Sequence, residues 1–247
     1  MAKTRKAPRL AAEEFTEAVT DRLGDRIRGV LLYGSLARGE AIPGVSDVNL
    51  LVTLTSFESA EIVALAPLAR RWTKSGNTAP LVLLETEWRQ AADVFAVELS
   101  DMIDARELLH GEDPVDGAMV ATSSLRLQTE RELRGKLIQL REGIMITAEK
   151  PKELGTLLLR ALPSFTTYQR AILRLAGRPV PADTEHVIRE ACALVDAEPN
   201  GFLDVWRARR ANETIRCAPG DAVVHTYRET VERLTTHVDR ILEEEHP

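Results

Sequence analysis

Two short apolar runs separated by a glycine-serine turn constrain the fold of this chain more than any other feature. Residues 29–33 form the first run, Gly34 and Ser35 follow it, and a second run covers residues 48–54. Short apolar runs bounded by turn residues predict buried strands. Since side chains alternate along a strand, Asp47 and Asn49 are expected on one face where the second strand begins. The segment therefore predicts a glycine turn and a polar pair at one edge of a sheet.

These residues carry a family resemblance. Gly34 and Ser35, a spacer, and then Asp47 and Asn49 in front of an apolar run resemble the nucleotidyltransferase superfamily of DNA polymerase beta. The signature of that superfamily is a Gly-Ser pair, a spacer and Asp-x-Asp followed by apolar residues. This chain departs from it at Asn49, where the family has its second aspartate. A glycine turn next to a helix N-terminus can offer backbone N–H groups to a phosphate.

The resemblance implies a set of site residues. Gly34, Ser35 and Arg38 are expected to bind the nucleotide, with a brief helix after the turn, and Arg38 equally to hold the loop. Two Mg²⁺ ions are expected between the triphosphate and the catalytic, metal-binding residues. The expected catalytic and metal-binding residues are Asp47, Asn49 and a third carboxylate from a later strand. We take Glu98 as the third acid, with Asp101 and Glu85 as rivals and a solvated surface position as the alternative for Glu98.

Asn49 decides how far activity follows from the resemblance. Its amide oxygen can still bind Mg²⁺, but one formal charge is missing, and Mg²⁺ favours anionic oxygens. Two unit charges about 4 Å apart interact by roughly 4 kcal/mol at an effective dielectric near 20. Three explanations stay open: an enzyme that tolerates asparagine, a catalytically silent relative, and an introduced substitution.

Charge and cysteine content narrow the partners and the compartment. The net charge of −6 argues against an extended nucleic-acid surface and favours an NTP with a small-molecule or protein acceptor. The chain has 2 cysteines, a basic start with no apolar run after it, and no run of the ~18 apolar residues that a membrane span needs. We therefore expect a soluble cytoplasmic protein without a membrane partner. The oligomeric state, homo-oligomers included, is left open.

The first part of the chain alternates between helical and strand patterns. This alternation predicts an α/β (α+β) fold, with a mixed sheet flanked by helices, in a nucleotidyltransferase domain over residues 1–115. We expect further strands at residues 81–84 and 95–99, the latter because apolar residues alternate around Glu98. The expected helices cover residues 10–23, 57–72 and 87–94.

The second part shows helical periodicity only. Residues 116–247 are expected to form an all-α helical bundle, in which Pro163 kinks one helix. Gly135 and Gly155 lie inside the predicted helices and indicate close helix contacts. The expected helices cover residues 124–144, 151–162, 165–175, 183–197, 202–212 and 221–245.

Two functions follow as hypotheses. The first is Mg²⁺-dependent transfer of a nucleoside monophosphate from an NTP to a hydroxyl of a small molecule or protein, impaired or not by Asn49. The second is a silent, antitoxin-like module with the same fold that senses nucleotide or binds a partner. Turnover with pyrophosphate release separates the two.

Overall fold

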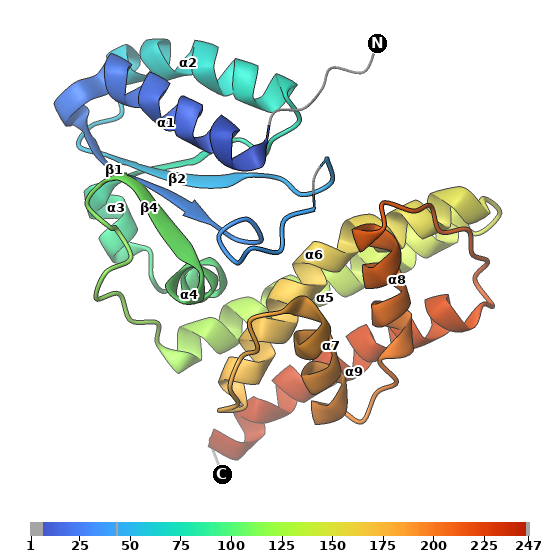
Figure 1. Cartoon of the computed structure of the whole chain (residues 1–247). Coiled ribbons are helices and arrows are strands. Elements are labelled where there is room, and N and C mark those ends of the chain that lie inside the picture. Colours follow the sequence, from blue (N-terminus) through green and yellow to red (C-terminus); the bar gives the residue numbers. More distant parts are fainter. Residues whose placement is uncertain (1–6, 43, 246–247) are drawn as a thin grey trace. The chain divides into compact units, whose positions relative to one another are not determined.

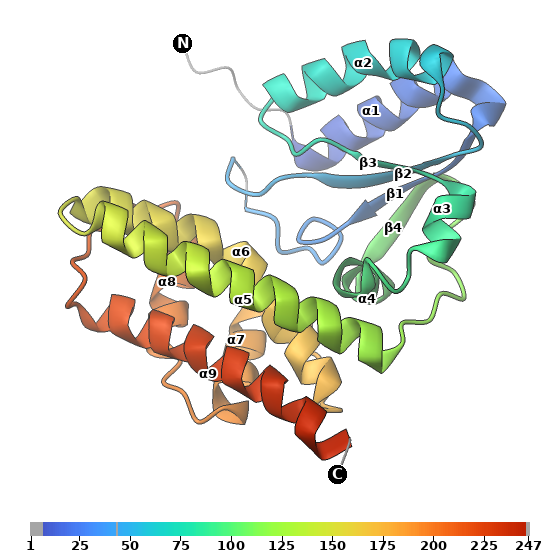
Figure 2. The same cartoon turned by 180° about the vertical axis from the view of Figure 1, so that it is seen from behind.

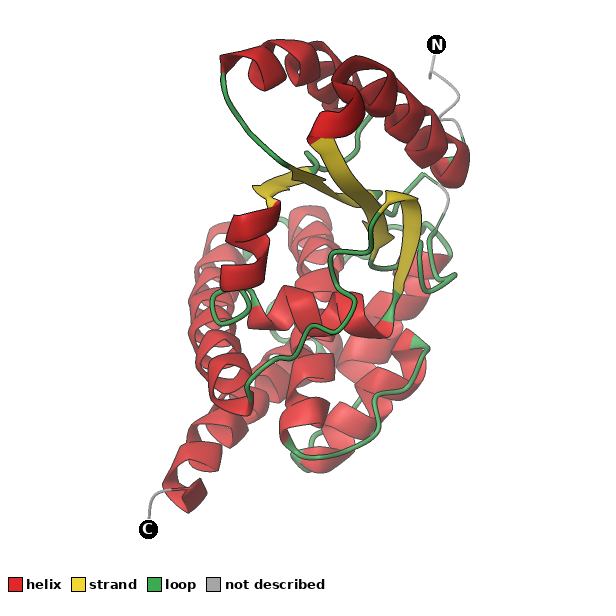
Figure 3. Cartoon of the chain, turned by 90° about the vertical axis from the view of Figure 1, so that its left-hand side faces the viewer, coloured by secondary structure: helices red, strands yellow, loops and turns green. Residues whose placement is uncertain are grey.

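The computed structural model describes residues 7–42 and 44–245, with the side chains of Arg89 and of residues 242–245 left out of the description. The basic start of the chain, residues 1–6, lies outside it. The chain divides into two compact units, Met1–Val120 and Ala121–Pro247. Among the described residues all strands belong to the first unit (Figure 3). The expected mixed sheet with flanking helices, followed by an all-α part, is confirmed.

The first unit is built on a four-stranded sheet in the order β3-β2-β1-β4. Strand β1 (Ile27–Tyr33) pairs antiparallel with β2 (Asn49–Leu54) and with β4 (Arg106–Gly111), whereas β3 (Leu81–Leu84) pairs parallel with β2. One antiparallel edge and one parallel edge make the sheet mixed. The two central strands are almost fully buried, as their continuous apolar runs predict.

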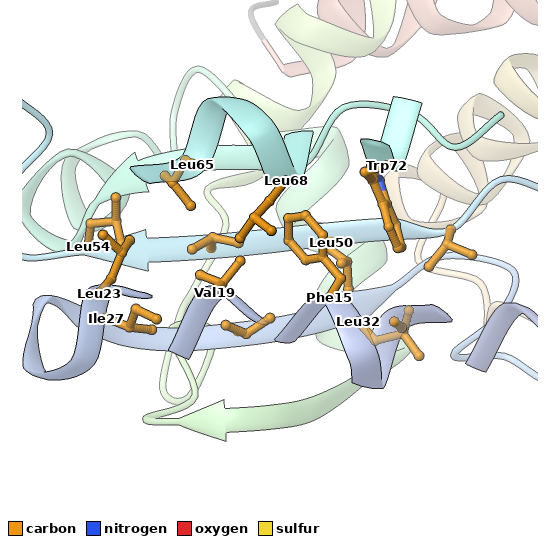
Figure 4. Packing of buried hydrophobic residues seen from close by; sticks show 14 residues of the cluster. Phe15, Val19, Leu23, Ile27, Leu32, Leu50, Leu54, Leu65, Leu68 and Trp72 are labelled. Atoms are coloured by element: carbon orange, nitrogen blue, oxygen red, sulfur yellow. The ribbon is translucent and has the colours of Figure 1, made fainter. Parts of the chain in front are cut away.

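Helices cover both faces of this sheet (Figure 1). Helices α1 (Pro8–Leu23) and α2 (Ser59–Lys74) lie on one face, where Phe15 and Trp72 pack with ring centroids 4.8 Å apart (Figure 4). Helices α3 (Glu85–Gln90) and α4 (Ala96–Asp104) lie on the other face. There a second cluster contains Leu31, Leu51, Trp88, Leu99, Met102 and Val115.

The predicted strand at residues 95–99 is wrong, because this segment forms α4. A short apolar run does not distinguish a strand from a buried helix, and the helical contacts of Leu99 and Met102 decide the outcome. The fourth strand is β4, which the pattern did not indicate. As an edge strand it has only partly buried and exposed residues, so it shows no apolar alternation.

The segment after Gly34 also differs from expectation, because residues 34–39 form turns instead of a brief helix. The third helix lies at Glu85–Gln90, earlier than residues 87–94. Leu84, the last residue of β3, donates its backbone N–H to Oε2 of Glu87 at 2.8 Å, so the helix starts directly after the strand.

The second unit consists, over its described residues, of five helices. Long helices α5 (Thr122–Thr147) and α6 (Pro151–Leu175) pack against each other, and α9 (Ala222–Glu245) packs on α5 and α8 (Figure 2). The shorter helices are α7 (Thr184–Leu194) and α8 (Asn200–Arg210). The rings of Phe202 and Tyr227 stack at 4.0 Å, and Phe165 meets both of them edge-on in the core.

Helix α6 runs through Pro163 without ending there. Proline lacks the N–H that would bind the carbonyl four residues earlier, which belongs to Leu159. Arg209 of α8 donates its Nη1–H to this carbonyl at 3.2 Å. A side chain from another helix thus supplies the donor that proline removes, and the predicted division into two helical segments is wrong.

Candidate functional site

The predicted glycine turn and polar pair meet where β1 ends and β2 begins. Tyr33, the last residue of β1, is the register partner of Asn49, the first residue of β2. Gly34 follows Tyr33 with φ of +78°, and a Cβ at this position would lie 2.8 Å from Nδ2 of Asn49. The left-handed backbone therefore favours glycine here, and any larger residue would also displace the end of the asparagine side chain.

The turn after Gly34 is held by its own backbone. The N–H groups of Arg38, Gly39 and Glu40 donate to the carbonyls of Gly34, Leu36 and Ser35 at 3.1, 3.1 and 2.8 Å. These bonds do not use the N–H groups of residues 35–37, which precede them. The arrangement is comparable to the first turn of a helix, where the leading N–H groups can serve a ligand.

Arg38 ties this turn to α4. Its Nη1 donates to Oδ1 of Asp101 at 3.0 Å, and its Nε lies 3.9 Å from Oε2 of Glu40. The side chains of Arg38 and Asp101 are only 13% and 9% exposed. The guanidinium charge is thus compensated within the protein, which is the loop-holding arrangement that the sequence left open beside nucleotide binding.

Asp47 lies two residues before β2, and so not on the strand that it was expected to share with Asn49. The preceding loop is closed by Ser46, whose hydroxyl accepts from the N–H of Ile42 at 2.9 Å. Val48 is 2% exposed and anchors the next position in the core. Between these two buried residues the side chain of Asp47 is exposed, and its Oδ2 accepts from the hydroxyl of Thr78 at 3.2 Å.

Alternation along β2 shows which face the site occupies. Val48 and Leu50 belong to the cluster under α1 and α2, whereas Leu51 belongs to the cluster under α3 and α4. Asn49 therefore faces the side of α3 and α4, as does Tyr33, which packs on the same cluster.

Glu98 lies in the first turn of α4 and is half-buried. Burial raises the pKa of Tyr33 to about 12, with further contributions from the charges of Glu98 and Asp101. Because their charges act on Tyr33, the carboxylates of Glu98 and Asp101 lie near the tyrosine that is paired with Asn49. The nominated acid thus comes from a helix, and not from a later strand as expected.

The rival acids are engaged in ion pairs. Asp101 binds Arg38, and Oε2 of Glu85 lies 3.3 Å from Nε of Arg28. Strand β3, the parallel neighbour of β2, brings no acid to the face that carries Asn49, because its Leu81 and Leu83 pack into the cluster on that face.

The donor set limits how a metal could be held. No group of three or more His, Cys, Asp and Glu side chains suited to a metal ion occurs in the part of the chain that the structure describes. Asp47 and Asn49 offer one carboxylate and one amide oxygen. Such a pair fits Mg²⁺ that arrives with a nucleotide, since this ion is usually bound by one or two carboxylates together with substrate phosphates.

Sequence reasoning missed Tyr33 and Thr78. Tyr33 directly precedes Gly34, so its position at the strand end was a usable signal. Thr78 lies in the loop before β3, and only the pairing of β3 with β2 brings it to Asp47. No local pattern could have indicated it.

The helical unit contains a separate polar groove of about 500 Å³. Its charged side chains are largely paired with one another or with neighbours: Arg233 with Glu229 at 2.8 Å, and Glu232 with Arg141 and Arg228, both at 2.8 Å. The groove is lined by Leu194, Val195, Glu229, Glu232, Arg233, Thr236, His237 and Arg240.

In the described part of the chain no helix combines the length and the apolar character of a membrane span.

No protein-family model matches the sequence, and comparison with curated proteins gives no match. Among solved structures, the chain is similar to spectinomycin adenyltransferase AAD(9) from Enterococcus faecialis, determined with ATP and spectinomycin. The TM-score is 0.58 at 11% identity, over 94% of this chain and 100% of that one. A toxin-antitoxin structure with AMP-PNP covers 54% of this chain and 98% of its own at 15% identity, but its TM-score of 0.30 supports no argument. The chain therefore shares the fold of a nucleotidyltransferase.

Proposed function

We propose that the protein transfers a nucleoside monophosphate from an NTP to a hydroxyl group, with Mg²⁺ as cofactor. The observation that carries this proposal is the meeting of the Gly34 turn with Asn49 and the neighbouring Asp47 at one edge of the sheet. A phosphate-binding turn beside oxygen ligands is the pairing that nucleotidyl transfer needs. The shared fold with an adenyltransferase supports the same reading.

Each residue has a role in this proposal. The N–H groups of residues 35–37 and the hydroxyl of Ser35 bind phosphate oxygens, and Arg38 holds the turn in shape through Asp101. Asp47 and Asn49 would hold Mg²⁺, which when bound neutralises charge on the transferred and leaving phosphates. The acceptor oxygen bonds to the α-phosphorus, the bond from that phosphorus to the β-phosphate oxygen breaks, and pyrophosphate leaves. Glu98 takes the proton of the acceptor hydroxyl.

We further propose a small molecule as the acceptor, in preference to a protein. The structural neighbour was determined with the small molecule spectinomycin, and similarity covers nearly the whole chain. The acidic net charge of −6 disfavours a long nucleic-acid acceptor.

A second candidate, nucleotide binding without turnover, is favoured by one observation. The face of the sheet that carries Asn49 has an amide where the family has a carboxylate, and the adjacent strand β3 presents leucines there. Asp47, which precedes β2, is then the one acid left of the Asp-x-Asp pair. A site with this reduced charge would still bind nucleotide phosphates through the turn.

One experiment separates the two candidates. Purified protein is incubated with each NTP, Mg²⁺ and a panel of hydroxyl-bearing small molecules, and pyrophosphate release and nucleotide affinity are measured together. Release that depends on Mg²⁺ and is lost in Asp47→Asn supports transfer. Tight binding without release, converted to release by Asn49→Asp, supports the silent module. Absence of nucleotide binding would exclude both.

A further inference from the structure

The loop between α2 and β3 approaches the start of β2, because β2 and β3 are parallel neighbours in the sheet. Leu51 pairs with Leu81 and Val52 with Val82, so the first residue of β3 lies beside the third residue of β2. Extending this register backwards brings the loop residues 77–78 next to Asp47 and Val48. The loop is therefore placed by sheet pairing at the edge that carries the candidate site.

Thr78 makes the contact that follows from this placement. Its Oγ1 donates to Oδ2 of Asp47 at 3.2 Å. A hydrogen bond to one carboxylate oxygen limits rotation of the group and leaves the other oxygen, Oδ1, in a defined direction. Partners of this kind orient metal-binding carboxylates in other proteins and raise metal affinity.

The backbone of Thr78 is itself held from the core. The indole Nε1–H of Trp72 donates to the carbonyl of Thr78 at 2.7 Å. Trp72 is 5% exposed and packs on Phe15, so this donor is fixed by the cluster under α1 and α2. The position of an exposed threonine is thus set by a buried tryptophan.

We infer that Thr78 is a positioning residue, which orients Asp47 for the metal-nucleotide complex, and that Trp72 fixes Thr78 for this task. The inference rests on the proposed function, because it assigns Asp47 to metal binding. It adds a contact outside the glycine turn and the polar pair, and it makes the loop of residues 75–80 part of the site.

The test measures metal binding directly. Mn²⁺ is titrated into protein with a non-hydrolysable ATP analogue, and bound metal is followed by electron paramagnetic resonance. Thr78→Val keeps the shape of the side chain but removes the hydroxyl, and we expect the apparent Mn²⁺ affinity to fall about three- to tenfold, as for loss of one exposed hydrogen bond. Thr78→Ser should restore affinity to within about twofold. Trp72→Phe, which removes the indole donor, should weaken binding in the same direction.

Thr55→Val is the matched control, because Thr55 is an exposed threonine just past the other end of β2, with its hydroxyl 3.4 Å from the carbonyl of Arg26. It should leave Mn²⁺ affinity unchanged, and thermal unfolding of all variants reports any general loss of structure. If wild-type protein binds Mn²⁺-nucleotide and Thr78→Val binds it equally well, the positioning role is overturned and the proposed function stands. If wild-type protein binds no Mn²⁺-nucleotide, the proposed function fails and the inference fails with it.

Discussion

The side-chain amide of Asn49 lies beside Gly34, so a side chain at the turn that ends β1 would displace the polar residue that starts β2. A methyl group at residue 34 would meet the amide at 2.8 Å. Gly34→Ala should lower the free energy of unfolding by about 2 kcal/mol, of which about 1 kcal/mol is the cost of a left-handed alanine, and should weaken nucleotide binding. Urea unfolding and nucleotide titration measure the two effects.

Gly39→Ala is the control for the backbone contribution. Gly39 has φ of +74° in the same turn, and no atom lies within 4 Å of a Cβ placed there. It should cost only the conformational part, about 1 kcal/mol. If both variants lost the same free energy of unfolding, the contact with Asn49 would contribute nothing to stability.

Restoring the missing carboxylate should strengthen the metal dependence of the protein. Asn49→Asp adds a negative charge near Asp47, and without metal the repulsion should lower the melting temperature. With Mg²⁺ and NTP the order should reverse, because ligand binding stabilises the folded state and a second anionic ligand raises metal affinity. Melting curves with and without Mg²⁺-NTP check this, and pyrophosphate release should increase. A variant that melts as wild type does under both conditions would contradict the assignment of Asn49 to the site.

The ion pair between Arg38 and Asp101 should be costly to break from one side. Arg38→Met leaves the carboxylate of Asp101 buried at 9% exposure, and we expect a loss of about 3 kcal/mol in the free energy of unfolding. Combining it with Asp101→Asn should recover much of the loss, since the uncompensated charge is gone. In the same unit, Arg28→Met breaks an exposed pair with Glu85 and should cost less than about 1 kcal/mol. Denaturant unfolding of the three variants and the wild type tests the contrast.

Tyr33 should make the protein sensitive to alkali. Its folded pKa of about 12 exceeds the ordinary value of 10, so the folded state holds its proton where the unfolded chain has lost it. Stability therefore falls as pH rises above 10, by about 1.4 kcal/mol per pH unit up to pH 12. Tyr227, whose pKa burial also raises, adds a parallel loss. Unfolding at pH 9 to 11.5 should show a shallower decline in Tyr33→Phe than in wild type, and identical slopes would refute the shift.

Two helical glycines should respond in opposite ways to alanine. A Cβ on Gly155 would lie 2.1 Å from the carbonyl oxygen of Ile215, whereas one on Gly135 meets nothing within 4 Å. Gly155→Ala should therefore destabilise the protein by about 2 kcal/mol or more, because a backbone atom must move. Gly135→Ala should stabilise it by about 0.5–1 kcal/mol through helix propensity. Thermal unfolding distinguishes them, and only for Gly155 does the structure agree with the close contact expected from the sequence.

The sequence predicted those elements whose pattern is long or continuous. The apolar runs of β1, β2 and β3 are continuous, and the long helices of the second unit bury residues at helical spacing, so both patterns can be recognised without the structure. The element α4 and the edge strand β4 were not, since a five-residue apolar run fits either structure and an edge strand is only partly buried. Local pattern is insufficient where tertiary contacts choose between two conformations.

The residues of the candidate site also fall into two groups, those that the sequence pattern indicates and those that only the fold brings together. Gly34, Ser35, Asp47 and Asn49 are close in sequence, and a spacing could indicate them. Thr78 reaches Asp47 only through the parallel register of β2 and β3, and Glu98 reaches the neighbourhood of Tyr33 only because α4 packs under the sheet. Contacts between residues distant in sequence require the fold to be known.

The proline in α6 has a consequence for how the helical unit assembles. The carbonyl of Leu159 lacks its usual N–H partner four residues ahead, and the guanidinium of Arg209 donates to it from α8. The protein donor for this carbonyl is in place only after α8 has docked, which links the two helices. This dependence adds cooperativity to the bundle: α6 and α8 should lose their amide protection against hydrogen exchange together around Leu159, as a single unfolding unit.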